Sequence, residues 1–133
     1  MVRYLLDTHI LFWWTCEDQR LQRAHKTLLA ELDRRGETVG LSAISLWELA
    51  MLAQRSRIQP PAPVGLWLQQ IERHPRIEIY PITADVAHAS ILEDDTLPGD
   101  PTDRIIIGTA LCHGLSLVTV DKRIRSSGCV SVA

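Results

Sequence analysis

Residues 4–14 read YLLDTHILFWW, in which one aspartate separates an apolar segment from a helical pattern. Residues 2–6 are apolar and compatible with a β-strand, and apolar side chains recur at helical spacing from Thr8 onward. We therefore predict a buried strand that ends at Asp7 and a helix that begins directly after it. An acid at this junction lies at the carboxyl end of the strand, which is where parallel α/β sheets bind ligands.

The rest of the chain repeats this alternation of strands and helices. Its apolar and turn residues predict further strands at 38–41, 76–80, 115–120 and 129–132. Helices are predicted at 19–35, from Ser42 or Ser45 to about 57, at 64–74, from Thr83 to about 92, and at 101–113. The connections include a proline-rich break at 59–63, an acidic loop at 93–100 and a turn at 121–126. This pattern indicates an α/β fold with a mainly parallel sheet and helices on both faces.

The composition is that of one ordinary globular domain spanning residues 1–133. No apolar run approaches the roughly 20 residues that cross a bilayer, and the first residues lack the long apolar region of a signal peptide. The three cysteines are an odd number at wide spacing, which suggests neither a disulfide framework nor a zinc site. We therefore expect a cytoplasmic protein without a membrane partner. The net charge of −2 argues against a nonspecific nucleic-acid coat.

Acidic residues stand at the predicted ends of two strands, at Asp7 near the start of the chain and at Asp121 near its end. These matching positions place both carboxylates at one edge of a parallel sheet. Each aspartate could alternatively cap a helix or stabilise a turn. Glu48 is a third candidate, because residues 45–53 surround it with apolar side chains and a buried carboxylate needs a partner. Its alternative role is a capping box with Ser45.

Residues 99–110 read GDPTDRIIIGTA and add two acids, Asp100 and Asp103, at the start of an apolar helix. Asp100 before Pro101 is typical of a helix N-cap, and Asp103 could complete a capping-box-like pair. If Asp103 instead joins the acids at the sheet edge, four like charges share one site and repel unless a cation neutralises them. All-oxygen ligands suit Mg²⁺ or Mn²⁺, whose waters can be oriented against a phosphorus atom.

Four motifs resemble those of PIN-domain ribonucleases, and among these the VapC toxins of bacterial toxin–antitoxin pairs most closely. They are Leu-Leu-Asp-Thr-His, Ser-x-x-Ser-Leu-Trp-Glu-Leu-Ala, Asp-Pro-Thr-Asp-Arg-Ile-Ile-Ile and Leu-Val-Thr-Val-Asp-Lys. The resemblance covers essentially the whole chain. It implies a PIN-like three-layer sandwich with the sheet in the middle. The chain has Thr102 where similar toxins often have an aromatic residue, and Gly108 where alanine is commoner, and neither position is one of the acids.

The resemblance also implies a function, that of a metal-dependent endoribonuclease which hydrolyses RNA phosphodiester bonds as a toxin. The cofactor that the resemblance implies is Mg²⁺ or Mn²⁺. By the same resemblance, the family's catalytic and metal-binding acids correspond to Asp7, Glu48, Asp103 and Asp121. The supporting residues expected around these acids are Thr8, Thr119, Arg104 and the helix cap Asp100. Arg104 is expected to hold a neighbouring carboxylate or an RNA phosphate, unless it is a plain surface arginine.

The expected partners, besides RNA, follow from the same resemblance. It implies a homodimer and a cognate antitoxin, joined in a toxin–antitoxin hetero-oligomer, with an antitoxin segment lying across the groove and blocking the metal site. Trp13 and Trp14 are the candidate antitoxin contacts, because neighbours on one helix cannot both point inward. Any of the four tryptophans could instead belong to the core.

Two other classes of function are compatible with an acid at a strand end. A phosphoaspartyl phosphatase would want a second acid two residues after Asp7, where this chain has His9. A signalling receiver would want paired acids before its phosphorylated strand, and these are absent. A catalytically idle module that binds RNA or protein would be favoured by the loss of one of the four acids, but all four are present.

Overall fold

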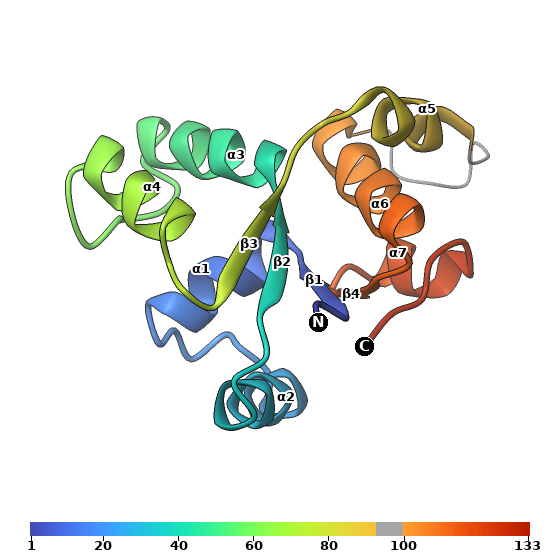
Figure 1. Ribbon diagram of the computed structural model, residues 1–133. Coiled ribbons are helices and arrows are strands. Elements are labelled where there is room, and N and C mark those ends of the chain that lie inside the picture. The colour runs from blue at the N-terminus through green and yellow to red at the C-terminus, as the bar shows by residue number, and fades with distance from the viewer. Residues whose placement is uncertain (93–99) are drawn as a thin grey trace.

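A parallel sheet forms the centre of the protein (Figure 1). The structure is a computed structural model that describes residues 1–92 and 100–133, so the predicted acidic loop lies outside the described residues except for Asp100. In this part of the chain the sheet has the strand order β3-β2-β1-β4, and each neighbouring pair is parallel. The strands are β1 (Tyr4–Leu6), β2 (Val39–Ser42), β3 (Ile77–Tyr80) and β4 (Ser116–Val118).

Helices follow the strands and cover both faces of the sheet (Figure 1). They are α1 (Thr8–Thr15), α2 (Arg23–Arg34), α3 (Ala43–Gln54), α4 (Val64–Glu72), α5 (Ala84–Leu92), α6 (Pro101–His113) and α7 (Lys122–Ser127). None of the helices within residues 1–92 and 100–133 is both long and apolar enough to cross a membrane. The predicted α/β fold with a parallel sheet between helices is therefore confirmed.

The core has two halves, because successive strand residues point to opposite faces of the sheet. Leu6 and Val118 belong to a cluster that also contains buried residues of the first four helices, among them Leu11, Leu29, Leu49 and Ile71. Leu5 and Leu117 belong to the other cluster, with Ile106 of α6 and Ile124 of α7. Burial of a leucine side chain contributes about 1.5–3 kcal/mol relative to exposure. The alternation of strand side chains thus attaches a helical layer to each face.

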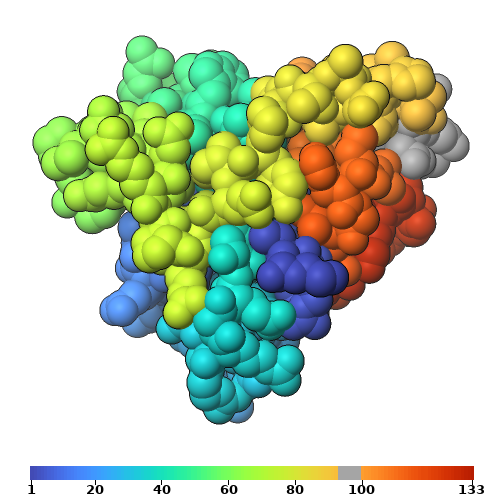
Figure 2. Space-filling model, viewed as in Figure 1, coloured from blue at the N-terminus to red at the C-terminus, as the bar shows by residue number. Residues whose placement is uncertain are grey.

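Helix α5 packs closely against α6, and Figure 2 shows the yellow residues of α5 against the orange residues of α6. A Cβ atom added to Gly108 of α6 would lie 2.8 Å from the carbonyl oxygen of Val86 and 2.9 Å from the backbone nitrogen of Ser90. Both of these residues belong to α5. The absence of a side chain at Gly108 therefore sets how closely the two helices approach.

Three local predictions were wrong. The second helix begins at Arg23 rather than at residue 19, because Asp18 forms a turn in which its side chain accepts the backbone N–H of Arg20 at 2.9 Å. Residues 122–127 form the short helix α7 in place of a turn. Residues 129–132 form no strand, and only an isolated parallel bridge joins Leu117 to Val132.

Candidate active site

Five acidic side chains line one hollow of about 360 Å³. They are the four predicted site residues Asp7, Glu48, Asp103 and Asp121, together with the cap Asp100. The other described residues that line this acidic hollow are His9, Ile10, Trp13 and Val120. A larger hollow of about 620 Å³ shares none of these residues and has Asp18 as its only acid among the described residues. The structure thus brings the side chains of the four acids to one hollow.

Asp7 directly follows β1, one of the two inner strands, and lies beside the end of β4. Its backbone N–H donates to the carbonyl of Val118 at 3.0 Å, which continues the ladder between β1 and β4 by one residue. One carboxylate oxygen accepts the backbone N–H of Thr8 at 2.8 Å, and the other accepts the hydroxyl of Thr119 at 2.6 Å. Burial raises the pKa of Asp7, although these two hydrogen bonds oppose the shift. Asp7 thus caps α1 and is also held in a fixed orientation.

Thr119 connects the two acids that follow β1 and β4. Its hydroxyl oxygen accepts the backbone N–H of Asp121 at 3.1 Å while its proton is donated to Asp7. Asp121 in turn accepts the backbone N–H groups of Arg123 at 2.9 Å and of Ile124 at 3.3 Å, and this cap starts α7. The expectation that Thr119 supports the acids agrees with this geometry.

Glu48 lies in the second turn of α3, further into the helix than a capping box would place it. Ser42 is the N-cap of α3, with its hydroxyl accepting the backbone N–H of Ile44 at 3.3 Å. The alternative of a capping box with Ser45 was therefore wrong. Ser45 is buried instead and accepts the hydroxyl of Thr8 at 2.9 Å, which joins α1 to α3. Burial raises the pKa of Glu48, and the charge of Asp7 contributes to the shift.

Asp100 and Asp103 have different surroundings although both line the acidic hollow. Asp100 is exposed, and its side chain accepts the backbone N–H of Thr102 at 2.9 Å, so the predicted N-cap is confirmed. Asp103 lies in the first turn of α6 and is partly buried. Burial raises the pKa of Asp103 to about 7, and the charges of the other four acids add to the shift. The pKa of Asp103 is therefore raised by its burial and, in addition, by the charges of all four neighbouring acids.

The donor set fits a hard divalent cation. All five acids offer carboxylate oxygens, and their mutual repulsion at Asp103 is a free energy that a cation would relieve. Within residues 1–92 and 100–133, no three Asp, Glu, His or Cys side chains form a ready-made coordination shell. Mg²⁺ commonly binds through one or two carboxylates and keeps several waters, so it does not require such a shell.

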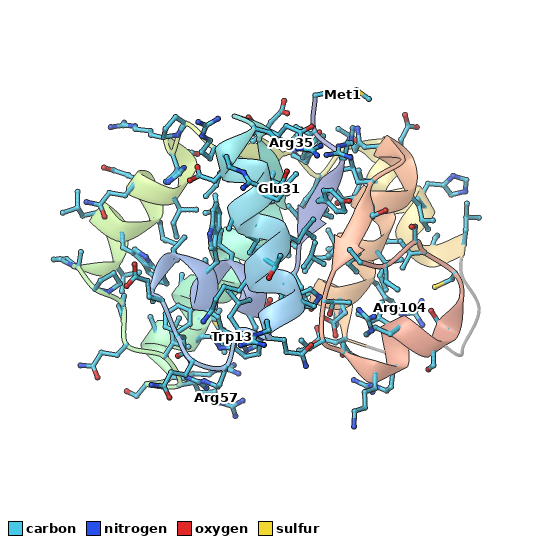
Figure 3. The ribbon with its side chains drawn as sticks, turned by 90° about the horizontal axis from the view of Figure 1, so that it is seen from below. Met1, Trp13, Glu31, Arg35, Arg57 and Arg104 are labelled. Carbon is cyan, nitrogen blue, oxygen red and sulfur yellow. The ribbon has the colours of Figure 1, made fainter. Side chains whose placement is uncertain are left out.

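Of the predicted residues Trp13, Trp14 and Arg104, only Trp13 lines the acidic hollow. Trp13 lines the acidic hollow, whereas Trp14 does not and faces His74 with a ring-centroid distance of 6.2 Å. Both tryptophans are half-buried and pack partly against the core. Arg104 lies on α6 and does not line the hollow (Figure 3). In the described part of the chain, no ion pair joins Arg104 to a carboxylate.

Two features of the site surroundings were not anticipated from the sequence. His9 lines the acidic hollow, and its position two residues after Asp7 is the only signal that could have indicated this. Trp47 is 55% exposed and lines a neighbouring hollow of about 300 Å³ that also contacts Glu48 and Asp100. A core position was the alternative role for each of the four tryptophans. Trp67 has this role, because it is buried.

Known proteins resemble this chain in both sequence and fold. A family model described as PIN domain matches residues 4–127. Ribonuclease VapC22 of Mycobacterium tuberculosis (strain ATCC 25618 / H37Rv) is 43% identical over 126 residues, which cover 95% of this chain and 92% of that protein.

Solved structures at low sequence identity share the fold. VapBC2 from Rickettsia felis, bound to a DNA fragment from their promoter, gives a TM-score of 0.69 at 20% identity and covers 100% of this chain and 98% of its own. VapC20 of Mycobacterium tuberculosis, described as a sarcin-ricin loop cleaving toxin, gives a TM-score of 0.65 at 16% identity. This match covers 97% of the present chain and 98% of VapC20. These structures agree with the arrangement of a parallel sheet between two helical layers.

Proposed function

Because the chain belongs to the PIN-domain family, we propose that it is an endoribonuclease that hydrolyses RNA phosphodiester bonds with Mg²⁺ or Mn²⁺ and acts as the toxin of a toxin–antitoxin pair. The observation that carries this proposal is the convergence of Asp7, Glu48, Asp103 and Asp121 in one hollow at the carboxyl edge of the sheet. The 43% identity to a protein named as a ribonuclease supports the choice of RNA as the substrate. An idle binding module would not require four acids to be kept together against their mutual repulsion.

The chain's own residues prepare the hollow for a metal ion and a phosphate. Asp7, Glu48, Asp103 and Asp121 would hold the ion, which when bound supplies positive charge to the phosphodiester and lowers the pKa of water. Thr119 orients Asp7 relative to Asp121 through its two hydrogen bonds. The bond between Thr8 and Ser45 fixes α1 against α3 and thereby the position of Glu48. Arg104 is placed on the same helix as Asp103 and would contact a phosphate outside the hollow.

A cognate antitoxin and a second copy of the chain are the proposed protein partners. Solved relatives of the same fold include a toxin–antitoxin complex from Klebsiella pneumoniae, which supports a hetero-oligomer. Ile91 and Leu92 at the end of α5 are 71% and 66% exposed, which supports a homodimer through an apolar contact. We expect Trp13→Ala and Trp14→Ala each to weaken antitoxin binding, since both rings are only half-buried and leave part of their surface to a partner.

The experiment that tests this function is the sequencing of RNA ends after brief expression of the chain without a partner. Growth arrest with recurrent new RNA ends is expected in the wild type, and neither is expected in Asp103→Asn. The purified protein should cleave the same RNA with Mg²⁺ or Mn²⁺ and stop when a chelator is added. Cleavage that persists in protein confirmed to be free of metal would contradict the metal-dependent mechanism.

A further inference from the structure

Part of the lining of the acidic hollow is apolar. This part consists of Ile10, Trp13 and Val120. Among the described lining residues there are five acids and no lysine or arginine. Such a hollow offers a phosphate no lysine or arginine, so apart from the charge of a bound ion, its apolar side chains are what can contribute to the affinity for RNA. The largest apolar surface available for this purpose is the indole ring of Trp13.

Two neighbouring side chains, Arg20 and His9, lie close to the ring of Trp13 and restrict its movement. The guanidinium carbon of Arg20 lies 5.8 Å from the ring centroid, within the range of a cation–π contact. Arg20 is itself fixed by Asp18, with nitrogen–oxygen distances of 2.9 and 3.1 Å. His9, one helical turn before Trp13, has its ring centroid 5.8 Å away at an interplanar angle of 49°. A ring that is fixed before binding loses little conformational freedom when a ligand stacks on it.

We propose that Trp13, flanked by His9, is the subsite for an unpaired RNA base next to the phosphodiester bond that the acids cleave. This inference rests on the proposed function. Every base has an aromatic face that can stack on an indole, and single-stranded RNA exposes these faces, whereas a duplex covers them. Trp13 would therefore position the substrate and influence which base is accepted beside the cut. Trp14 has no such role, because its ring faces His74 outside the acidic hollow.

The test compares Trp13→Leu and Trp13→Phe with the matched control Trp14→Leu. The purified proteins, without antitoxin, are given total bacterial RNA and a randomised single-stranded RNA pool in Mg²⁺ or Mn²⁺, and the cut ends are sequenced. Trp13→Leu should raise KM about 10-fold or more, the effect of losing one stacked base, with a smaller change in kcat. It should also weaken the base preference beside the cut. Trp13→Phe should keep a KM and a base preference close to those of the wild type, because its ring can still stack on a base. Trp14→Leu should resemble the wild type in both quantities.

The possible results separate this inference from the proposed function. If the wild type cleaves neither RNA sample, the proposed function fails and the subsite fails with it. If the wild type cleaves but Trp13→Leu keeps the KM and base preference of the wild type, the ribonuclease stands and the subsite is wrong. Reduced antitoxin binding by Trp13→Leu with unchanged cleavage would assign the ring to the protein partner instead, and would also overturn the inference. Thermal melts of all three variants identify any loss of folding.

Discussion

Asp100 and Asp103 stand three positions apart at the start of α6, yet their surroundings differ. Asp100 is exposed and accepts the backbone N–H of Thr102, whereas Asp103 is partly buried among the other acids. Sequence alone could not separate these roles, because both carboxylates satisfy the pattern of a helix start. The separation comes from burial, which depends on how α6 packs against the sheet.

The first prediction contrasts substitutions of these two aspartates. Asp103→Asn should remove most ribonuclease activity with little loss of stability, because relief of like-charge repulsion offsets any lost contact. Asp100→Ala should lose about 0.5–2 kcal/mol of stability, as lost N-caps do, and keep substantial activity. Thermal melts and cleavage rates at saturating Mg²⁺ measure both effects, and Asp100→Ser controls for the cap. Full activity in Asp103→Asn would contradict the role of Asp103 at the metal.

A second prediction concerns the pH dependence of stability in the metal-free protein. Asp103 has a pKa of about 7 when folded, against an ordinary value of 3.8, so between these values the folded state binds more protons than the unfolded state. The stability contributed by this group is therefore present at low pH and is lost as the pH rises through about 7. Asp103→Asn has no such loss, so its melting temperature should exceed that of the wild type by an amount that grows between about pH 4 and pH 7 and levels off above pH 7.

The difference between the two proteins isolates Asp103 from other titrating groups. Asp7 and Glu48 also have raised pKa values and act in the same direction, but both remain in the variant. Asp18 has a lowered pKa because of its hydrogen bonds to Arg20, so it titrates below this window. A difference in melting temperature that stays constant with pH would show that Asp103 is not destabilised by its neighbours.

At the scale of elements, the strand ends were the most predictable feature. Apolar runs that stop at an acid, at Asp7 and near Asp121, predicted one ligand-binding edge, and the parallel pairing of β1 with β4 brings these ends together. The helix at 101–113 was predicted with the bounds it has in the structure, because Asp100 and Pro101 mark its start and Gly114, with φ of +63°, its end.

The elements near the end of the chain were less predictable for two physical reasons. Residues 122–127 carry three charged side chains and little apolar periodicity, so the helix there is marked only at its ends, by the cap of Asp121 and by Gly128. Residues 129–132 are apolar enough for a strand, but Val132 makes only one bridge, to Leu117. Pairing between segments depends on the tertiary fold and is not encoded in local propensity.

The third prediction tests the contact between α5 and α6 at Gly108. Alanine within a helix is normally about 1 kcal/mol more stable than glycine. At Gly108 the added Cβ would meet backbone atoms of α5 at 2.8 and 2.9 Å, which side-chain rotation cannot relieve. Gly108→Ala should therefore destabilise the protein, since overpacking typically costs about 1–3 kcal/mol.

Gly65 in α4 is the matched control for this prediction. It is exposed, and a Cβ added there would meet nothing within 4 Å. Gly65→Ala should therefore leave the stability unchanged or raise it by up to about 1 kcal/mol. Urea unfolding of both variants measures the two effects. Equal effects at Gly108 and Gly65 would show that α5 does not approach α6 as closely as described.

At the scale of the whole molecule, the candidate site joins segments that are distant in sequence. Asp7 and Asp121 follow two adjacent strands, Glu48 lies on α3, and Asp103 lies on α6. Figure 3 shows Trp13 and Arg104 on the α1 and α6 sides of the molecule. An ion held by these acids would connect the helical layers across the sheet edge, so its binding should affect the stability of the fold and not only catalysis.

The fourth prediction follows from this linkage. Mg²⁺ or Mn²⁺ should raise the melting temperature of the wild type, because an ion that binds only the folded state stabilises it by about 2.7 kcal/mol at 100 times its Kd. Asp103→Asn removes one of the carboxylates and should show a smaller shift at every metal concentration.

Sodium chloride at equal ionic strength is the control, since it screens the repulsion among the acids without binding at a specific site. If sodium chloride reproduced the whole shift, or if Asp103→Asn responded to Mg²⁺ as strongly as the wild type, the acids would share the hollow without holding an ion. A shift that saturates with Mg²⁺ in the wild type and weakens in Asp103→Asn would connect the convergence of the four acids to metal binding independently of any RNA substrate.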